Sequence, residues 1–213
     1  MRLFSITTIL YSLSSLSVTL AANSFSASNL YYAAGLTDSQ STTLLSGLQS
    51  AGVKVLRVWL DGKLFCLNSS VDLKLTNRTG QSGSVKGTTI NSFNSLQGSS
   101  PNDWDDTVLN RLDNFMVKAN SYGIKLLISI HSYNALQAAN DFYGQWYGTG
   151  DFYTDSNAIG YFKQRIAHVL AHVNPANGKT WSQSSEYIFA FEAQNEAMHD
   201  QVCPTLSSIG SNF

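Results

Sequence analysis

Apolar residues follow two alternating patterns along the chain, and together these predict a parallel α/β fold. Short runs dominated by apolar residues have the length and composition of buried strands. These runs are 25–33, 53–59, 124–130 and 187–193. Between them, apolar residues recur every three to four positions, as on one face of a helix. Strands that alternate with helices predict right-handed βαβ crossovers, and these would curl the sheet into part of a (β/α)8 barrel.

Polar residues mark where the helices begin. The candidate N-caps are Thr37, then Asn102 or Asp103, then Asp155 or Ser156. Thr37 has the clearest pattern, because Gln40 follows three positions later and completes a capping box.

The third helix carries two histidines. Its inward face includes Ile159 and Val173, whereas Arg165, His168 and His172 lie on the opposite face. The histidines have the i, i+4 spacing of metal ligands, but the glutamate of a metalloprotease motif is missing. We therefore expect a solvated surface there, and we expect neither a metal nor another cofactor.

The alternating pattern stops after residue 199. A complete barrel typically needs about 250 residues, whereas removal of a leader leaves roughly 190 in this chain. The fold class is therefore predicted to be α/β, of the (β/α)8 TIM-barrel type, truncated to about four βα units. Residues 23–199 would form the N-terminal half of the barrel, and 200–213 an irregular C-terminal tail.

The first 22 residues have the features of a secretory signal peptide. Arg2 precedes an apolar run, 3–20, which ends at Ala21 and Ala22. A secreted protein, with no membrane segment after removal of residues 1–22, is therefore expected. The net charge of -1, with 13% charged residues, gives no indication of a nucleic-acid partner.

Two features in other segments fit an extracellular location. Asn68 and Asn77 begin Asn-X-Ser/Thr sequons and are predicted glycosylation sites. Cys66 and Cys203 are the two cysteines of the chain. They could pair in an oxidising compartment, although the sequence does not decide between a disulfide and two free thiols.

Polar side chains at the carboxyl ends of the predicted strands are the candidate site, because the loops of a parallel α/β fold converge there. These residues are Arg57, His131, Asn195 and Glu196. Glu196 is the candidate general acid/base, since a carboxyl group surrounded by aromatic rings loses hydration and holds its proton nearer neutral pH. Asn195 could bind a sugar hydroxyl or cap a turn. His131 could bind substrate or complete a buried polar network.

Arg57 and Glu192 raise the question of a second carboxylate. Arg57 could support a carboxylate at the mouth of the barrel, or pair with Glu192 for structural reasons. Glu192 lies four residues before Glu196, about 13 Å along a strand. It is therefore too deep to be the partner at about 5 to 5.5 Å that a retaining glycosidase needs. Asp141, Asp151 and Asp155 of the third loop stay open as partners.

Aromatic residues near these strand ends suggest a binding cleft. Trp59 ends the second strand, and Tyr143, Trp146 and Tyr147 follow in the third loop. Such rings either stack on the apolar faces of sugar rings or anchor the loop in the core.

The motifs resemble glycoside hydrolase family 5, in clan A. The matching stretches are RVW (57–59), LDNFMVKANSYGIKLLISIH (112–131), the WYG and FYT of the third loop, and IFAFEAQNE (188–196). The run FYTD...YFKQRIAHVLAHVNPANGKTW before the last stretch is similar to fungal endo-β-1,4-mannanases.

The resemblance implies a secreted retaining β-glycanase that hydrolyses β-1,4-mannosidic bonds in mannan-type polysaccharides. Glu196 would be the acid/base, Asn195 would contact the sugar 2-hydroxyl, and Arg57 would support the nucleophile. That nucleophile is a glutamate on strand seven of the family barrel, and this chain has only three glutamates, all within 186–196. The fragment is therefore expected to be inactive. The alternatives are a β-glucanase or cellulase of the same family, which His131 favours, and a non-catalytic carbohydrate-binding half-barrel.

Overall fold

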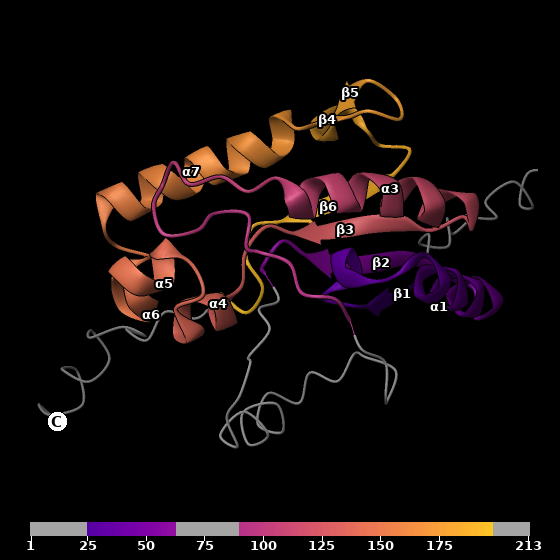
Figure 1. Cartoon of the computed structure of the whole chain (residues 1–213), viewed down its shortest axis with the longest axis horizontal. Helices are drawn as coiled ribbons and strands as arrows, with labels where there is room; N and C mark the ends of the chain where they lie inside the picture. The colour runs from indigo at the N-terminus through magenta and orange to yellow at the C-terminus, as the bar shows by residue number, and fades with distance from the viewer. Residues whose placement is uncertain (1–24, 63–89, 198–213) are drawn as a thin grey trace, which may run out of the picture.

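The computed structural model describes residues 25–62 and 90–197 (Figure 1). Four parallel strands form one sheet in the order β1-β2-β3-β6. They are β1 (Ser26–Asn29), β2 (Val53–Trp59), β3 (Lys125–Ser129) and β6 (Ile188–Glu192). Spatial order follows chain order, as expected for successive βα units of a barrel.

Three crossover helices cover one face of the sheet. They are α1 (Asp38–Ser50), α3 (Thr107–Ser121) and α7 (Ser156–Ala171). Alternate strand residues such as Leu56, Val58, Leu126 and Ile128 are inaccessible to solvent and pack against helix residues in one apolar cluster. We call this helix-covered side the outer face and the opposite side the inner face.

The capping-box prediction is confirmed. The Thr37 hydroxyl accepts from the Gln40 backbone N–H at 3.3 Å, and the Thr37 N–H donates to Gln40 Oε1 at 2.8 Å. The bounds predicted for β2 are also confirmed.

The second helix begins later than predicted, at an N-cap formed by Asp106 rather than Asn102 or Asp103. The Asp103 carboxylate instead accepts from Ser99 N–H at 2.8 Å, and Trp104 forms an isolated bridge with Gln97. These contacts hold residues 97–104 in a loop in front of α3, which periodicity did not reveal.

The prediction for α7 was wrong on its polar face and at its end. Asp155 is its N-cap, as expected. However, Arg165 is inaccessible to solvent, because its Nε and Nη2 both donate to the Ile130 carbonyl. Ile159 is exposed, and Val173 lies beyond the helix in an unpredicted hairpin of β4 (Val173–Asn174) and β5 (Lys179–Thr180).

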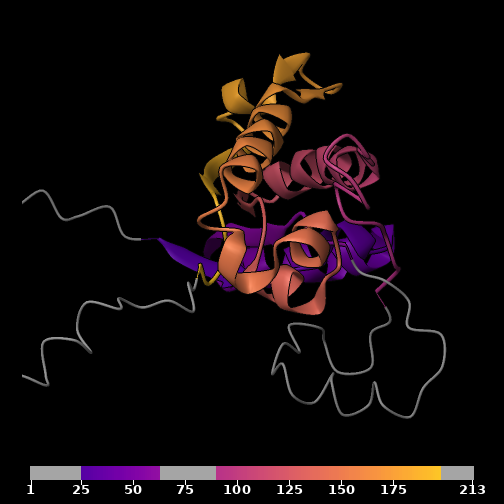
Figure 2. The same ribbon diagram turned by 90° about the vertical axis from the view of Figure 1, so that its left-hand side faces the viewer.

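The aromatic third loop folds into three short helices rather than an irregular segment. They are α4 (Tyr133–Ala138), α5 (Phe142–Trp146) and α6 (Gly148–Asp151). They lie at the end of the sheet to which the strands point, while the β4–β5 hairpin lies at the other end (Figure 1). Figure 2 looks onto the carboxyl ends of the strands, with these helices in front.

Two 3-10 helices complete the described elements. They are η2 (Ala33–Gly35), before α1, and η3 (Trp181–Gln183), before β6. No helix in 25–62 or 90–197 is both long and apolar enough to cross a membrane. The leader 1–22, Cys66, Cys203, Asn68, Asn77 and the tail 200–213 lie outside the described residues, so the predictions for them stay predictions.

Candidate active site

Arg57 connects β2 to the end of β6. Its Nε donates to Glu192 Oε2 at 2.9 Å, a second bond to the same oxygen comes from Nη2, and Nη2 also donates to Asn195 Oδ1 at 2.6 Å. The guanidinium crosses β3 on the inner face, where Ser129 stands in register with Glu192 and leaves room with its small side chain. Of the two partners left open for Arg57, the structure shows Glu192, and it adds Asn195.

Asn195 is buried and held on three sides. Its backbone N–H donates to the His131 carbonyl at 2.9 Å, and its carbonyl accepts from Tyr133 N–H at 3.0 Å. Its Oδ1 accepts from Arg57. Its Nδ2 is buried without a hydrogen-bond partner among residues 25–62 and 90–197. A buried amide N–H without a partner costs free energy, so Nδ2 is an unsatisfied donor directly before Glu196.

Glu196 directly follows Asn195 beyond the end of β6 and is exposed. Its φ of 50° is in the left-handed region, which costs a non-glycine residue about 1 to 3 kcal/mol and is often found at functional sites. The expected wall of aromatic rings around this carboxyl is not present in the described structure. The carboxylate is therefore accessible to a ligand.

His131 is inaccessible to solvent, and protein groups occupy both of its ring nitrogens. Nε2 lies 2.9 Å from Asp141 Oδ2, and Nδ1 lies 3.1 Å from Gln194 Nε2. Of the two readings that the sequence allowed, the structure supports the buried polar network, and direct contact with a substrate is not possible in this conformation.

The predicted stacking residues divide into core and surface. Trp59 is 2% exposed, with its ring 3.8 Å from that of Tyr31 and 5.7 Å from the Arg57 guanidinium carbon. Tyr143 is fully buried among the aromatic residues of the third loop, and burial raises the pKa of its hydroxyl. Both are therefore anchors in this structure rather than open platforms. Trp146, at 54% exposure, keeps a ring that a sugar can reach.

Two of the three aspartates of the third loop are bound to other protein groups, and Asp151 stays open as a partner carboxylate. Asp141 is fully buried, accepts from Gly144 N–H at 3.2 Å and faces His131. Burial alone would raise the pKa of Asp141, but His131, its hydrogen bond and Arg165 lower that pKa overall. Asp155 caps α7 by accepting from two backbone N–H groups, and Asp151 lies in α6.

The histidines of α7 are not on a solvated surface, which corrects that prediction. His168 Nε2 lies 2.7 Å from Asp106 Oδ1, and its ring stacks on Trp104 at 4.0 Å. His172 Nε2 lies 2.8 Å from Asp113 Oδ2. Within the described residues, no three histidine, cysteine or acidic side chains converge as metal ligands.

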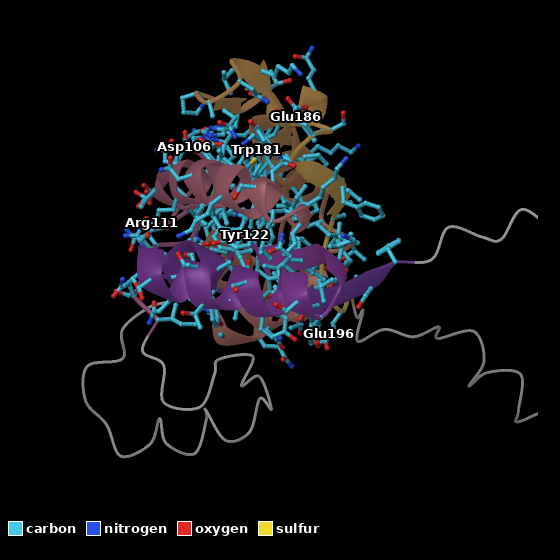
Figure 3. The ribbon with its side chains drawn as sticks, turned by 90° about the vertical axis from the view of Figure 1, so that its right-hand side faces the viewer. Asp106, Arg111, Tyr122, Trp181, Glu186 and Glu196 are labelled. Carbon is cyan, nitrogen blue, oxygen red and sulfur yellow. The ribbon has the colours of Figure 1, made fainter. Side chains whose placement is uncertain are left out.

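A further contact to a carboxylate of α3 comes from η3. Trp181 Nε1 donates to Asp113 Oδ1 at 2.7 Å, and Figure 3 shows Asp106 and Trp181 beside α3. α3 supplies these carboxylates 59 or more residues before their partners in the chain, a separation at which periodicity has no signal.

A cavity of about 370 Å³ is lined by residues that follow β1 and by residues of α1 and α3. It lies between α1 and α3 and is lined by residues that include Asp38, Arg111, Phe115 and Lys118. Lys118 already pairs with Asp38 across it. The cavity is on the helix side of the sheet and does not include Arg57, Asn195 or Glu196, so it is separate from the candidate site.

The sequence assigned no role to Gln194 and gave no sign of the contact between Asp141 and His131. Gln194 precedes the Asn-Glu pair, and Tyr153 Oη donates to its Oε1 at 2.7 Å. Its position in a polar trio at a strand end was the available signal. Asp141 follows Asn140 before an aromatic run, a typical N-cap position, and this could have predicted its burial at the start of α5.

Comparison with known proteins agrees with these features. No family model matches the chain. Mannan endo-1,4-beta-mannosidases 2 and 5 of Solanum lycopersicum are each 33% identical to it over 105 residues, 46% of this chain and 25% of the relative. The chain thus spans about a quarter of the length of the curated relatives it matches.

Solved structures extend the likeness to most of the chain. The endo-1,4-beta-mannanase from Rhizomucor miehei has a TM-score of 0.53 and 23% identity, covering 81% of this chain and 43% of that one. A glycoside hydrolase family 5 mannosidase from the same organism has a TM-score of 0.52 and 18% identity, covering 82% and 44%. Over about four βα units, the fold is therefore that of a (β/α)8 barrel, and this part of the chain is similar to the solved family 5 mannosidase and mannanase named above.

Proposed function

We propose that this chain carries the acid/base half of a secreted retaining β-glycanase that acts on β-1,4-linked mannan. The observation that carries the proposal is the bond from Arg57 to Asn195, directly before Glu196, at the carboxyl ends of β2 and β6. It places an arginine, an amide and an accessible carboxylate together at the edge of the sheet where parallel α/β folds bind ligands.

Each of these groups has a role in the proposed reaction. Glu196 protonates the glycosidic oxygen as the bond breaks and later takes a proton from the attacking water. The unpartnered Nδ2 of Asn195 donates to a sugar hydroxyl next to the bond. Trp146 stacks on a sugar ring further along the chain of the substrate.

The nucleophile is the missing part of the pair. Arg57 holds Glu192 through two hydrogen bonds to one oxygen. Glu186 pairs with Lys179 beside the β4–β5 hairpin, and Figure 3 shows it far from Glu196. These are the three glutamates of the chain. We therefore propose that the 213-residue chain binds mannan but does not hydrolyse it by itself.

Mannan is preferred to glucan because the relatives and solved neighbours are named as mannanases. Secretion, with glycans on Asn68 and Asn77, is supported by the leader-like residues 1–22. A non-catalytic binding half-barrel has no separate observation in its favour.

Calorimetric titration of the 213-residue chain with mannohexaose and cellohexaose tests the binding. We expect mannohexaose to bind at least about tenfold more tightly, a difference of about 1.4 kcal/mol. Trp146→Ala should weaken it, because it removes the stacking surface. Phe189→Ala is the matched control, since Phe189 is a similarly exposed aromatic residue in β6, near the amino ends of the strands. Equal or tighter binding of cellohexaose would favour a glucanase, and no binding of either would remove the proposal.

Release of reducing sugar from galactomannan tests the missing nucleophile. The purified chain should release none above the buffer rate. Hydrolysis that disappears in Glu196→Gln would show instead that the described carboxylates are sufficient.

A further inference from the structure

Four side chains form one continuous chain of hydrogen bonds directly under the Asn195–Glu196 segment. Tyr153 Oη donates to Gln194 Oε1 at 2.7 Å, Gln194 Nε2 lies 3.1 Å from His131 Nδ1, and His131 Nε2 lies 2.9 Å from Asp141 Oδ2. None of them has a part in the proposed acid/base chemistry itself. They come from separate parts of the chain. Asp141 is the N-cap of α5, His131 follows β3, Gln194 follows β6, and Tyr153 follows α6.

The donors and acceptors of these hydrogen bonds can be assigned by starting from Asp141. Asp141 Oδ1 accepts from the backbone N–H of Gly144, and the lowered pKa of Asp141 keeps this carboxylate charged at neutral pH. His131 Nε2 must then be the protonated nitrogen. A neutral imidazole presents an acceptor at its other nitrogen, so Nδ1 accepts from the Gln194 amide. The Gln194 carbonyl is thereby turned to the Tyr153 hydroxyl.

The surroundings of His131 hold its ring in one orientation. The ring of Phe152 stacks on it at 5.5 Å, and the rings of Tyr143 and Phe162 meet it edge-on at 5.5 and 5.9 Å. Its side chain has no exposed surface. A ring enclosed in this way cannot exchange its two nitrogens without repacking the third loop.

The charged and titratable groups around His131 come from several elements. Asp141 faces Nε2, Arg165 of α7 binds the adjacent Ile130 carbonyl, and Asp61 follows β2. Burial raises the pKa of Asp61, with His131 and Arg165 offsetting part of that rise, and Tyr143 stays protonated because burial raises the pKa of its hydroxyl. Asp141 is thus the carboxylate in hydrogen-bond contact with the ring.

The same segment also carries the candidate site. The His131 carbonyl accepts from the Asn195 N–H, and the Asn195 carbonyl accepts from Tyr133 N–H. Gln194 immediately precedes Asn195, so the side-chain bond from Gln194 to His131 and the backbone bond from Asn195 to His131 fix the two ends of one peptide unit. A change at His131 therefore reaches Asn195 through both bonds.

We propose that Asp141, His131 and Gln194 are positioning residues for the Asn195–Glu196 pair, and that they act through a neutral His131 protonated at Nε2. We call these three residues the relay. Its role in catalysis rests on the proposed function, whereas its geometry does not. Neither Asp141 nor Gln194 touches the substrate. They set the orientation of the peptide that presents the Asn195 amide and the Glu196 carboxylate.

Nitrogen NMR of the histidine-labelled 213-residue chain tests the assignment directly. At pH 7 the buried imidazole should show a protonated Nε2 and an unprotonated Nδ1. In Asp141→Asn, Gly144 N–H still needs an acceptor, so the asparagine Oδ1 faces Gly144 and its NH₂ faces Nε2. His131 should then change to the tautomer protonated at Nδ1. A wild-type ring protonated at Nδ1, or an unchanged tautomer in the variant, would overturn the proposal.

Gln194→Glu tests the other end of the relay. A carboxylate at residue 194 accepts but cannot donate, so each ring nitrogen would face a carboxylate and the imidazolium should persist to at least one pH unit higher than in the wild type. Gln145→Glu is the matched control, because Gln145 is an exposed glutamine on α5 whose side chain binds the Ala139 carbonyl. An equal change in the control would reduce the effect to general electrostatics and refute the relay.

Amide hydrogen exchange and binding connect the relay to the site. Asn195 and Tyr133 amides should exchange at least about fivefold faster in Asp141→Asn and Gln194→Glu than in the wild type and Gln145→Glu, with the far-ultraviolet circular dichroism unchanged. Mannohexaose affinity should fall by a similar factor. If the wild type binds no mannohexaose, the proposed function fails, yet the tautomer and exchange data still decide the relay. If the wild type binds mannohexaose and the relay variants change neither amide exchange nor affinity, the relay is refuted and the proposed function stands.

Discussion

The two faces of the sheet differ in how completely the described residues cover them. On the outer face, Leu56, Val58, Leu126 and Ile128 have no exposed surface, because α1, α3 and α7 pack over them. On the inner face, the Arg57 and Glu192 side chains are 21% and 33% exposed. The same strands therefore supply a closed apolar layer on one side. On the other side Arg57 and Glu192 are partly exposed, although Val55 and Trp59 are buried.

Residues that stabilise the fold and residues of the candidate site therefore lie on different faces of the same strands. The outer face buries apolar area, the main favourable term in folding, and tolerates loss of volume poorly. The inner face instead arranges hydrogen-bonding groups around Asn195 and Glu196. We expect substitutions on the two faces to have different effects, even where the residue type and the strand are the same.

Leu126 and Leu127 give the largest expected contrast. They are adjacent in β3, with Leu126 fully buried on the outer face and Leu127 partly buried on the inner face. Leu126→Ala should lower the free energy of unfolding by about 3 kcal/mol, as removal of a buried leucine leaves a cavity, and Leu127→Ala by about 1 kcal/mol. Urea unfolding measures both. Equal losses would mean that the inner face of the 213-residue chain is covered in solution.

Much of this layered fold could be predicted from the sequence, because strands and helices bury one face each. The run 53–59 and the capping box at Thr37 are local signals, and the structure confirms both. The polar face of α7 was not predictable in this way. Arg165 looked solvated by periodicity, but the Ile130 carbonyl, 35 residues away, accepts its two N–H donors. A partner so distant in sequence has no local pattern.

For the candidate site, the sequence accounts for where some of the residues lie, and their roles stay predictions. Arg57, Asn195 and Glu196 lie at strand ends, so the topology alone brings the strands together there, and the structure shows Arg57 bonded to Asn195. Burial of individual aromatic rings was not predictable. Trp59 and Trp146 have the same side chain, yet they are 2% and 54% exposed, because packing of Tyr31 against Trp59 depends on contacts between separate strands.

Asp61 and Asp141 give the second contrast, because their pKa values are shifted in opposite directions. Both are buried aspartates near His131 and Arg165. Burial is the largest influence on Asp61 and raises its pKa overall, although His131, Arg165 at 4.0 Å and Ser132 offset part of that rise. The pKa of Asp141 is lowered overall, since His131 and Arg165 outweigh the effect of burial. Replacement by asparagine should therefore have opposite effects on stability at the two sites.

The direction of each effect follows from proton linkage. Folded Asp61 binds its proton more tightly than unfolded Asp61, so its ionisation destabilises the fold at neutral pH. Asp61→Asn should be more stable than wild type at pH 7, and the difference should vanish below the unfolded pKa of about 3.9. Asp141→Asn should be less stable at pH 7, and its deficit should shrink as pH falls through the lowered folded pKa. Urea unfolding from pH 3 to 8 separates them, and effects of the same sign would contradict the opposite shifts.

Glu186 gives the smallest expected effect and extends the comparison to the two ends of the sheet. It accepts from Lys179 Nζ at 2.9 Å and Asn177 Nδ2 at 2.8 Å near the β4–β5 hairpin. Hydrogen bonds from its own backbone N–H, then from Lys179 and Asn177, lower the pKa of Glu186 to about 2. Because the folded pKa lies below the ordinary value of 4.5, the stabilisation is present above that value and is lost as pH falls toward 2.

Glu186→Gln should therefore lower the melting temperature by less than about 2 °C at pH 7, and the two proteins should melt together near pH 2. The pair with Lys179 is exposed, so 0.5 M salt should reduce the difference further. Mannohexaose binding should not change, since Glu186 bonds to Lys179 of the β4–β5 hairpin, which lies at the end of the sheet opposite to α4, α5 and α6 (Figure 1). A loss of binding in Glu186→Gln would mean that the amino ends of the strands also contact the glycan, and the division of the molecule into a stabilising side and a binding end would not hold.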